Sequence, residues 1–236
     1  MPVALVTGAA RGLGRAFAQA LAEDGYDCAI HYNTSQEQAI ALGETLQTHG
    51  VRTVALTADV RQQREAEALI DKTVAALGSI DVLLNNVGNY IQQDLADFPS
   101  ESWLEMFDSN LHSSFYTSQR ALHYMRRQGK GRIINIGFAG AEQIVARPSI
   151  AAYSIAKTGV ILYSKALAKT EAKHGVTVNV ISPGIMENTS AFPKTSIPMG
   201  RLGSYEDARA ALRYLISEEA NYVTGITIEL AGGWNL

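Results

Sequence analysis

The sequence is short of cysteine and of long apolar runs. Cys28 is the only cysteine among 236 residues, which excludes an internal disulfide and most cysteine-based metal sites. No apolar run reaches the roughly 18 residues of a membrane-spanning helix, and the first strand-like segment begins without a basic, cleavable leader. We therefore expect a cytoplasmic protein that does not bind membranes.

The charge balance argues against further classes of partner. The net charge is −3 and charged residues make up 18% of the chain, so neither a nucleic-acid-binding surface nor a disordered acidic tail is indicated. A small-molecule partner fits this composition better. No metal site is expected, because the histidines lack ligand spacing to carboxylates or cysteines and are interpreted as structural or surface residues: His31, His49, His112, His123 and His174.

Strand-like and helix-like segments alternate along the whole chain without a low-complexity linker. Strands are expected near residues 2–7, 27–32, 51–57, 81–85, 131–137, 176–182 and 225–230. Helices are expected near residues 12–24, 36–49, 62–77, 101–128, 152–173 and 205–217. This alternation predicts an α/β fold with right-handed crossovers, in which seven strands form a doubly wound parallel sheet with helices on both faces. The length fits one domain over residues 1–236.

A glycine-rich turn follows the first expected strand and precedes an amphipathic helix. It reads Thr7-Gly8-Ala9-Ala10-Arg11-Gly12-Leu13-Gly14, with the spacing G-x-x-x-G-x-G rather than G-x-G-x-x-G. Glycines allow a tight turn and a close backbone approach, and a helix N-terminus attracts anions. The turn therefore predicts a pyrophosphate-binding site in a dinucleotide-binding domain, with an ordinary turn as the alternative.

Tyr153 and Lys157 stand four residues apart on an expected helix. A four-residue step rotates a side chain by only about 40°, so the two groups share one face. A neighbouring cation lowers the pKa of a phenol and makes it usable as a general acid or base. Such pairs are also common on solvated helix faces, so the pair acquires weight only together with the glycine-rich turn.

Combined, these motifs resemble the short-chain dehydrogenase/reductase family from end to end, and within it the 3-oxoacyl-carrier-protein reductase-like members. The resemblance rests on the residues 7–14, Asp59-Val60, Asn85-Asn86-Val87-Gly88, Asn110, Tyr153 with Lys157, Pro183-Gly184 and Gly232-Gly233. It implies that Asp59 and Val60 flank an adenine, that Asn86 and Gly88 line the cofactor, and that Pro183 and Gly184 meet the nicotinamide. It also implies that Tyr153 delivers a proton, that Lys157 lowers its pKa and holds the ribose, and that Asn110 positions a relay water.

The serine that members of this family carry after the fifth strand is missing. Alignment on the strand places Phe138 there, in the substrate pocket, whereas counting back from Tyr153 places Gly140 there. No serine or threonine occurs between residues 137 and 148. Losing one donor to a developing oxyanion costs about 2.7–4 kcal/mol. Candidate replacements, each with a surface role as the alternative, are Glu142, Gln143 and Ser149.

The second strand indicates NADP rather than NAD. NAD specificity normally needs an acid at the carboxyl end of this strand. The strand ends His31-Tyr32-Asn33-Thr34-Ser35, whereas Asp27 begins it and so lies at the wrong edge. Arg11, Asn33 and Ser35 are expected to hold a 2′-phosphate, with a solvated Arg11 as the alternative.

The favoured hypothesis is an NADPH-dependent reductase of a small-molecule carbonyl substrate, such as a 3-oxoacyl thioester or another ketone. A pteridine or folate reductase and a catalytically weakened nucleotide-binding sensor are the alternatives, both motivated by the missing serine. Residues 185–203 are expected to form a flap over the substrate, and Asn89, Tyr90 and Gln92 a second wall. The resemblance also implies a homotetramer, or a homodimer, built from the helices at 101–128 and 152–173 and the last strand.

Overall fold

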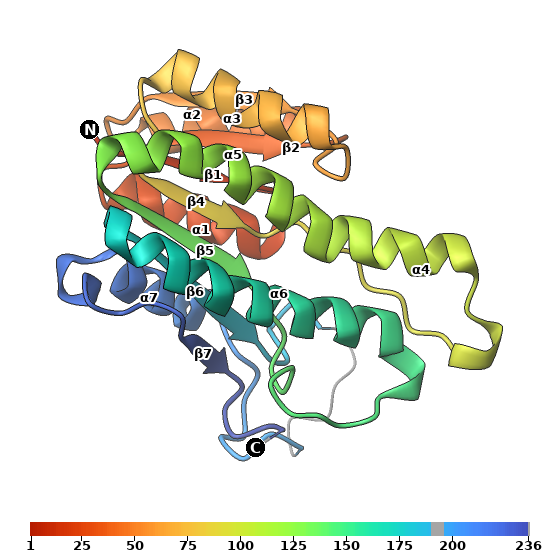
Figure 1. Cartoon of the computed structure of the whole chain (residues 1–236). Coiled ribbons are helices and arrows are strands. Elements are labelled where there is room, and N and C mark those ends of the chain that lie inside the picture. The colour runs from red at the N-terminus through yellow and green to blue at the C-terminus, as the bar shows by residue number, and fades with distance from the viewer. Residues whose placement is uncertain (190–195, 236) are drawn as a thin grey trace.

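In the computed structural model, which describes residues 1–189 and 196–235, all seven strands form one parallel sheet (Figure 1). The sheet order is β3-β2-β1-β4-β5-β6-β7, so the chain starts in the middle and winds outward in both directions. The inner strands β1 and β4 are fully buried and mostly apolar, as is typical of a parallel sheet covered on both faces, whereas the edge strands β3 and β7 are partly exposed. Their bounds are β1 Val3–Val6, β2 Asp27–Tyr32, β3 Thr53–Thr57, β4 Val82–Asn85, β5 Gly131–Ile136, β6 Val176–Pro183 and β7 Thr227–Leu230.

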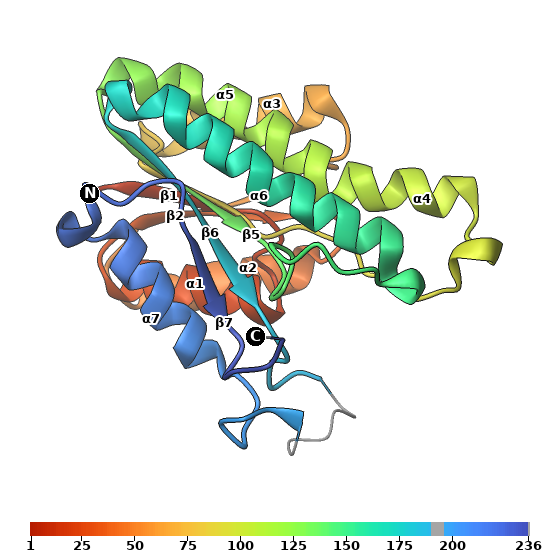
Figure 2. The same cartoon turned by 60° about the horizontal axis from the view of Figure 1, so that its bottom comes forward.

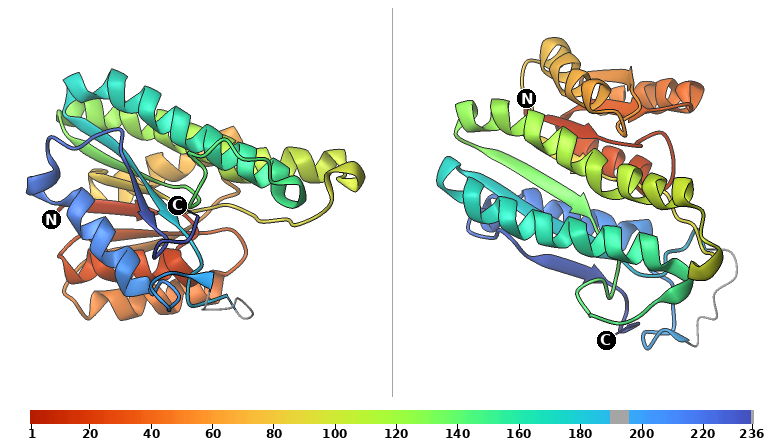
Figure 3. Two further views of the ribbon diagram at one scale, coloured as in Figure 1. Left: turned by 90° about the horizontal axis from the view of Figure 1, so that it is seen from below. Right: turned by 45° about the vertical axis from the view of Figure 1, so that its right-hand side comes forward.

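Helices cover both faces of the sheet (Figures 2 and 3). One core contains side chains of α1 (Gly12–Glu23), α2 (Gln36–Gln47) and α7 (Tyr205–Ile216). The core on the opposite face contains side chains of α3 (Gln63–Leu77), α5 (Ser113–Gln128) and α6 (Ala151–Glu171). The predicted fold class is confirmed. Among residues 1–189 and 196–235, no helix has the length and apolarity needed to cross a membrane.

The single helix expected over residues 101–128 is wrong in detail. The structure has α4 (Ser100–Phe107), a π-helical segment (Asp108–His112) and then α5. α4 projects past the carboxyl ends of the strands (Figure 1). The π-helical segment contains Asn110, and such insertions in α-helices often mark functional sites.

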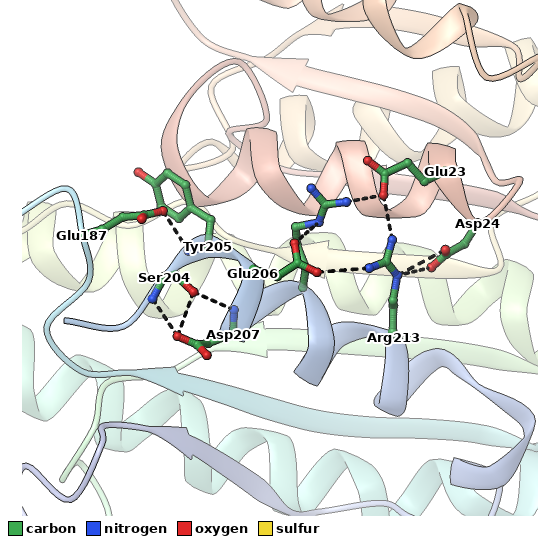
Figure 4. A network of polar contacts seen from close by, with 9 residues as sticks. Glu23, Asp24, Glu187, Ser204, Tyr205, Glu206, Asp207 and Arg213 are labelled. Carbon is green, nitrogen blue, oxygen red and sulfur yellow. Dashed lines mark hydrogen bonds and ion pairs between the residues drawn. The ribbon is translucent and has the colours of Figure 1, made fainter. Parts of the chain in front are cut away.

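Polar contacts fix α7 against the end of α1 and against the segment after β6 (Figure 4). Arg213 pairs with Glu23 and Asp24, and the Ser204 and Asp207 side chains form a capping box at the start of α7. The Tyr205 amide donates to the Glu187 carboxylate over 2.9 Å. Part of the predicted flap, 190–195, lies outside the described residues, whereas the backbone at Met186 forms a bridge to Gly203. The two described ends of the predicted flap therefore meet beside α7.

The first turn of α1 lies directly against the glycine-rich turn. A Cβ atom on Gly14 would lie 2.4 Å from the Gly8 carbonyl oxygen and 2.7 Å from Asn86 Nδ2. The Asn86 amide donates to the Thr7 and Gly8 carbonyls over 3.0 and 3.3 Å. Glycine at position 14 therefore lets α1 approach β1 and β4 closely enough to pack the turn.

We expect Gly14→Ala to lower the melting temperature, because its methyl group would collide with backbone as well as with Asn86. Overpacking of this kind costs about 1–3 kcal/mol, and each kcal/mol shifts the melting temperature of a chain this long by roughly 2–4 °C. Gly43→Ala in α2 is the matched control, since its closest neighbour is a side-chain oxygen at 3.2 Å and alanine favours the helix. Thermal unfolding of both variants tests this contact, and a Gly14→Ala protein as stable as the wild type would contradict it.

Candidate functional site

A cavity of about 480 Å³ lies beyond the carboxyl ends of β1 to β4. Its position is the one expected for ligands of an open parallel sheet. Of the predicted cofactor residues, those that line it are Gly8, Arg11, Asn33, Ser35, Asp59, Val60, Asn86 and Gly88. Those outside its lining are Gly12, Leu13, Gly14, Tyr153, Lys157, Pro183 and Gly184.

The glycine-rich turn leaves the N-terminus of α1 uncapped. Arg11 is the N-cap residue, and its side chain makes no capping hydrogen bond. The first turn carries no acidic residue, and Gly8 and Gly12 have φ angles of +64° and +57°, which favour glycine. The first N–H groups of the helix are therefore free of side-chain competition, so the turn fits a dinucleotide pyrophosphate.

His31 fixes this turn, a role that its sequence position did not indicate. Its Nδ1 accepts a hydrogen bond from the Gly8 amide over 3.0 Å, and its Nε2 lies 3.0 Å from the Ala58 carbonyl and donates to it. Burial lowers the pKa of His31, which favours this neutral form. The prediction of a structural role is confirmed, but the ring also lines the cavity. The role of His31 at the turn follows only from its contact with Gly8, which is distant in sequence.

The carboxyl end of β2 presents no acidic side chain to the cavity. Asp27 pairs in register with Val3 at the amino ends of β1 and β2, opposite to the cavity, as predicted. Its buried carboxylate accepts from Arg52 Nη2 over 2.7 Å and from the Arg52 amide over 2.7 Å. The cavity wall here consists of Tyr32, Asn33, Thr34 and Ser35. The exposed Arg11 also lines the cavity, so a cation and small polar groups border the same space.

Asp59 lines the cavity in partnership with Arg61, which sequence reasoning did not single out. The Arg61 guanidinium donates to both carboxylate oxygens of Asp59 over 2.7–3.1 Å and thereby lowers the pKa of that carboxyl group. Arg61 Nη1 also lies 3.8 Å from Glu105 on α4. Two consecutive cavity residues, Val60 and Arg61, thus present an apolar side chain and a guanidinium next to Asp59.

Asn110 directs one unpaired oxygen toward Gly88. Its Nδ2 donates to the carbonyls of Asn89 and Met106 over 2.9 and 3.0 Å, which fixes the amide. Its Oδ1 is buried and has no hydrogen-bond partner among residues 1–189 and 196–235. A Cβ atom on Gly88 would lie 2.4 Å from this oxygen and 3.3 Å from Lys157 Nζ. The structure therefore brings Asn110 Oδ1, an available acceptor, and Lys157 Nζ close to Gly88.

Tyr153 and Lys157 lie on the same face of α6, as predicted. Lys157 Nζ is buried, donates to the Ile136 carbonyl over 2.7 Å and lies 5.8 Å from the centroid of the Tyr153 ring. Burial lowers the pKa of Lys157 to about 8 and raises the pKa of Tyr153. The direction for Tyr153 is the reverse of the one predicted, because desolvation outweighs a cation that is itself held by Ile136.

The Phe138 ring, which follows β5, lies beside the Tyr153 ring. The two ring centroids are 5.5 Å apart at an interplanar angle of 68°. Among the candidate replacements for the missing serine, Glu142 pairs with Lys165 and Gln143 donates to the Asn235 carbonyl. Ser149 is exposed. No contact with Tyr153 ties any of these side chains to the site.

Gly137, the residue before Phe138, lies against a side chain of β6. A Cβ atom on Gly137 would lie 2.3 Å from Ser182 Oγ. This hydroxyl is buried, and no other described residue forms a hydrogen bond with it. A hydroxyl of β6 therefore fills the space that a side chain on residue 137 would require, so that position accepts glycine.

Comparison with known proteins identifies the family. The family model for short chain dehydrogenases matches residues 2–197. The 3-oxoacyl-(acyl-carrier-protein) reductase FabG of Staphylococcus aureus is 38% identical over 240 residues, covering 98% of this chain and 96% of that protein. A putative short-chain alcohol dehydrogenase from Sinorhizobium meliloti superposes with a TM-score of 0.93 at 31% identity, covering 99% and 96% of the two chains. Acetoin dehydrogenase YohF from Salmonella typhimurium does so with a TM-score of 0.90 at 31% identity, covering 99% and 95%. The chain belongs to the short-chain dehydrogenase family and is an oxidoreductase.

Proposed function

We propose that the protein reduces a carbonyl compound with NADPH, with Tyr153 as the proton donor. The observation that carries the proposal is the position of Asn110 and Lys157 beside Gly88, which also lines the cavity at the strand ends, with the Tyr153 ring 5.8 Å from Lys157 Nζ. Similarity to a 3-oxoacyl-(acyl-carrier-protein) reductase supports a 3-oxoacyl thioester or a related ketone as the substrate class.

The residues around the cavity fit NADPH. Gly8, Gly12, Leu13 and Gly14 bind the pyrophosphate through the turn and the N-terminus of α1. Arg11, Asn33 and Ser35 hold the 2′-phosphate, because the nearest acid on β2, Asp27, lies at the other edge. The adenine lies between Asp59 and Val60, and the rest of the cofactor is bordered by Asn86, Gly88, Pro183 and Gly184. When bound, NADPH supplies a hydride.

The catalytic residues move the proton. The Tyr153 phenol is protonated near neutral pH, because an ordinary phenol titrates near about 10 and burial raises the pKa of this one. Lys157 holds the ribose and orients the tyrosine as an ammonium. The free Oδ1 of Asn110 accepts a hydrogen bond from a relay water beside Gly88.

The absence of a serine keeps a pteridine or folate reductase as the alternative, since reduction of a cyclic imine depends less on that hydroxyl. A sensor protein without turnover is disfavoured, because such a protein has no need for an asparagine, a tyrosine and a lysine assembled at one point.

We further propose a homotetramer, with a homodimer as the alternative. Apolar side chains are exposed on the helices that were expected to form subunit contacts: Leu104, Phe115, Ile155 and Leu162. Multi-angle light scattering tests the mass of the assembly. The cytoplasmic location stays a prediction from the sequence.

NADPH is expected to bind more tightly than NADH. Arg11→Ala should weaken NADPH binding by about 1.5–3 kcal/mol, the contribution of a hydrogen bond to a charged group, and leave NADH binding unchanged. Arg127→Ala, at an exposed site near the end of α5, is the matched control. Fluorescence titration with both cofactors measures this, and equal affinities in the wild type would refute the assignment of Arg11, Asn33 and Ser35.

Tyr153→Phe is expected to lower kcat for ketone reduction by about 10²–10⁴, because general acid catalysis is lost. The dissociation constant for NADPH should stay nearly the same, since the phenol proton is not needed for docking. Lys157→Ala should impair both. Steady-state rates and cofactor titrations separate the two effects, and a Tyr153→Phe enzyme with most of its activity would exclude this proton donor.

The reductive kcat/KM should fall as the pH rises through about 8, where Lys157 loses its proton. The sign follows from burial: the folded-state pKa of Lys157 is lowered, so its ammonium is present below that pH and lost above it. Lys157→Arg should move the decline to a higher pH, because a guanidinium stays charged. Rates measured from about pH 6 to 10 test this, and a profile that is the same for both proteins would assign the decline to another group.

A further inference from the structure

The cavity at the strand ends contains an ion pair between residues that are two positions apart. Asp59 and Arg61 follow β3, and both line the cavity. The Arg61 amide donates to Asp59 Oδ1 over 3.1 Å, and Arg61 Nε lies 2.9 and 3.1 Å from Oδ1 and Oδ2. Arg61 Nη2 donates to Oδ2 over 2.7 Å. These contacts involve both oxygens, and an ionised carboxylate offers only about four acceptor positions in all.

The carboxylate of Asp59 is therefore committed to Arg61 before a ligand binds. Hydrogen bonds between charged groups are roughly twice as strong as those between neutral groups, and the planar fork of a guanidinium matches the two oxygens of a carboxylate. The same contacts lower the pKa of Asp59, so the carboxylate stays ionised at neutral pH. An amino group of a ligand would have to displace a guanidinium from this pair in order to reach an oxygen of Asp59.

Arg61 keeps N–H groups for which the chain supplies no acceptor. Across residues 1–189 and 196–235, nothing forms a hydrogen bond with Arg61 Nη1, and Glu105 Oε1 on α4 lies 3.8 Å from it. That oxygen accepts instead from Asn89 Nδ2 over 2.7 Å, so Glu105 attracts Arg61 by charge and leaves its N–H groups available. The Arg61 side chain is 36% exposed and lines the cavity, so a ligand can reach these donors.

These two properties determine which purine edge the site can bind. Adenine presents the N7 acceptor and a 6-amino donor on this edge, whereas a 6-oxopurine presents two acceptors, N7 and O6. An arginine donates to O6 and N7 together in the commonest specific contact between a protein and a base. Next to the buried Val60, a purine meets the donors of Arg61 and a carboxylate that is already paired.

We propose, on the basis of the NADPH site described above, that Arg61 sets the base selectivity of this site, which binds a 6-oxopurine dinucleotide at least as tightly as the adenine dinucleotide. Arg61 donates to the purine edge through its remaining N–H groups. Asp59 is a positioning residue, because it holds the guanidinium and does not accept from the base. The 6-amino group of adenine therefore contributes nothing to binding.

Fluorescence titration with NADPH and with deamino-NADPH tests this without turnover. Deamino-NADPH carries an oxygen in place of the 6-amino group and keeps the 2′-phosphate and the nicotinamide, so the two ligands differ only in the base. We expect the wild type to bind deamino-NADPH at least as tightly as NADPH. Arg61→Ala releases Asp59 as an acceptor for the amino group, so the ratio of the two dissociation constants should shift by about tenfold in favour of NADPH, as expected for one hydrogen bond to a charged group.

Two further variants control for charge and for folding. Arg64→Ala removes an exposed arginine at the start of α3 and should keep the wild-type ratio. Arg61→Lys keeps the cation without the planar fork, so it leaves one oxygen of Asp59 available and should give an intermediate ratio. Thermal unfolding shows whether each variant is folded, and Arg61→Lys carries the comparison if Arg61→Ala is not.

The outcomes separate this inference from the function on which it rests. Tighter binding of NADPH than of deamino-NADPH by the wild type, or the same ratio in the wild type and the Arg61 variants, overturns the role of Arg61 and leaves the reductase function intact. A shift of equal size in Arg64→Ala also overturns it, because the effect would then follow from net charge. A wild type that binds neither dinucleotide overturns the proposed cofactor itself.

Discussion

The close contact between α1 and the turn before it is the constraint on which the rest of the site depends. Gly14 lies where any side chain would collide with the Gly8 carbonyl, and Asn86 fills the remaining space from the end of β4. His31 holds the same turn from β2. The carboxyl ends of β1, β2 and β4 therefore all contact one glycine-rich turn. These contacts fix this wall of the cavity before any ligand binds.

The segment after β5 brings an aromatic ring and a guanidinium close to Tyr153. The Phe138 ring lies 5.5 Å from the Tyr153 ring, and the space beside Gly137 is filled by Ser182 from β6. The Arg147 guanidinium lies over that ring, 5.6 Å from its centroid. The two rings and the guanidinium therefore form one packed cluster at the end of β5.

The sequence predicted what depends on local pattern. The alternation of strands and helices correctly predicted the sheet and the helices that cover it. The position of Asp27 at the start of β2 correctly placed it at the amino ends of the strands, where the structure shows it paired with Arg52. The sequence did not reveal what depends on contacts between distant segments. The π-helical segment around Asn110 looked like an uninterrupted helix, and the roles of His31 and Arg61 follow from Gly8, Asp59 and Glu105, which lie on other segments.

Contacts between distant segments also explain why the pKa of Tyr153 is raised, although the sequence predicted that it is lowered. Helical spacing correctly placed Lys157 near the phenol, but the ammonium donates to the Ile136 carbonyl and both groups are desolvated. Burial disfavours the charged form of each, so the tyrosine keeps its proton and the lysine holds its proton less firmly. A protonated phenol is the form that a reductase uses first. The same burial makes this phenol a weaker acid, so proton donation relies on the basicity that the carbonyl oxygen gains in the reaction.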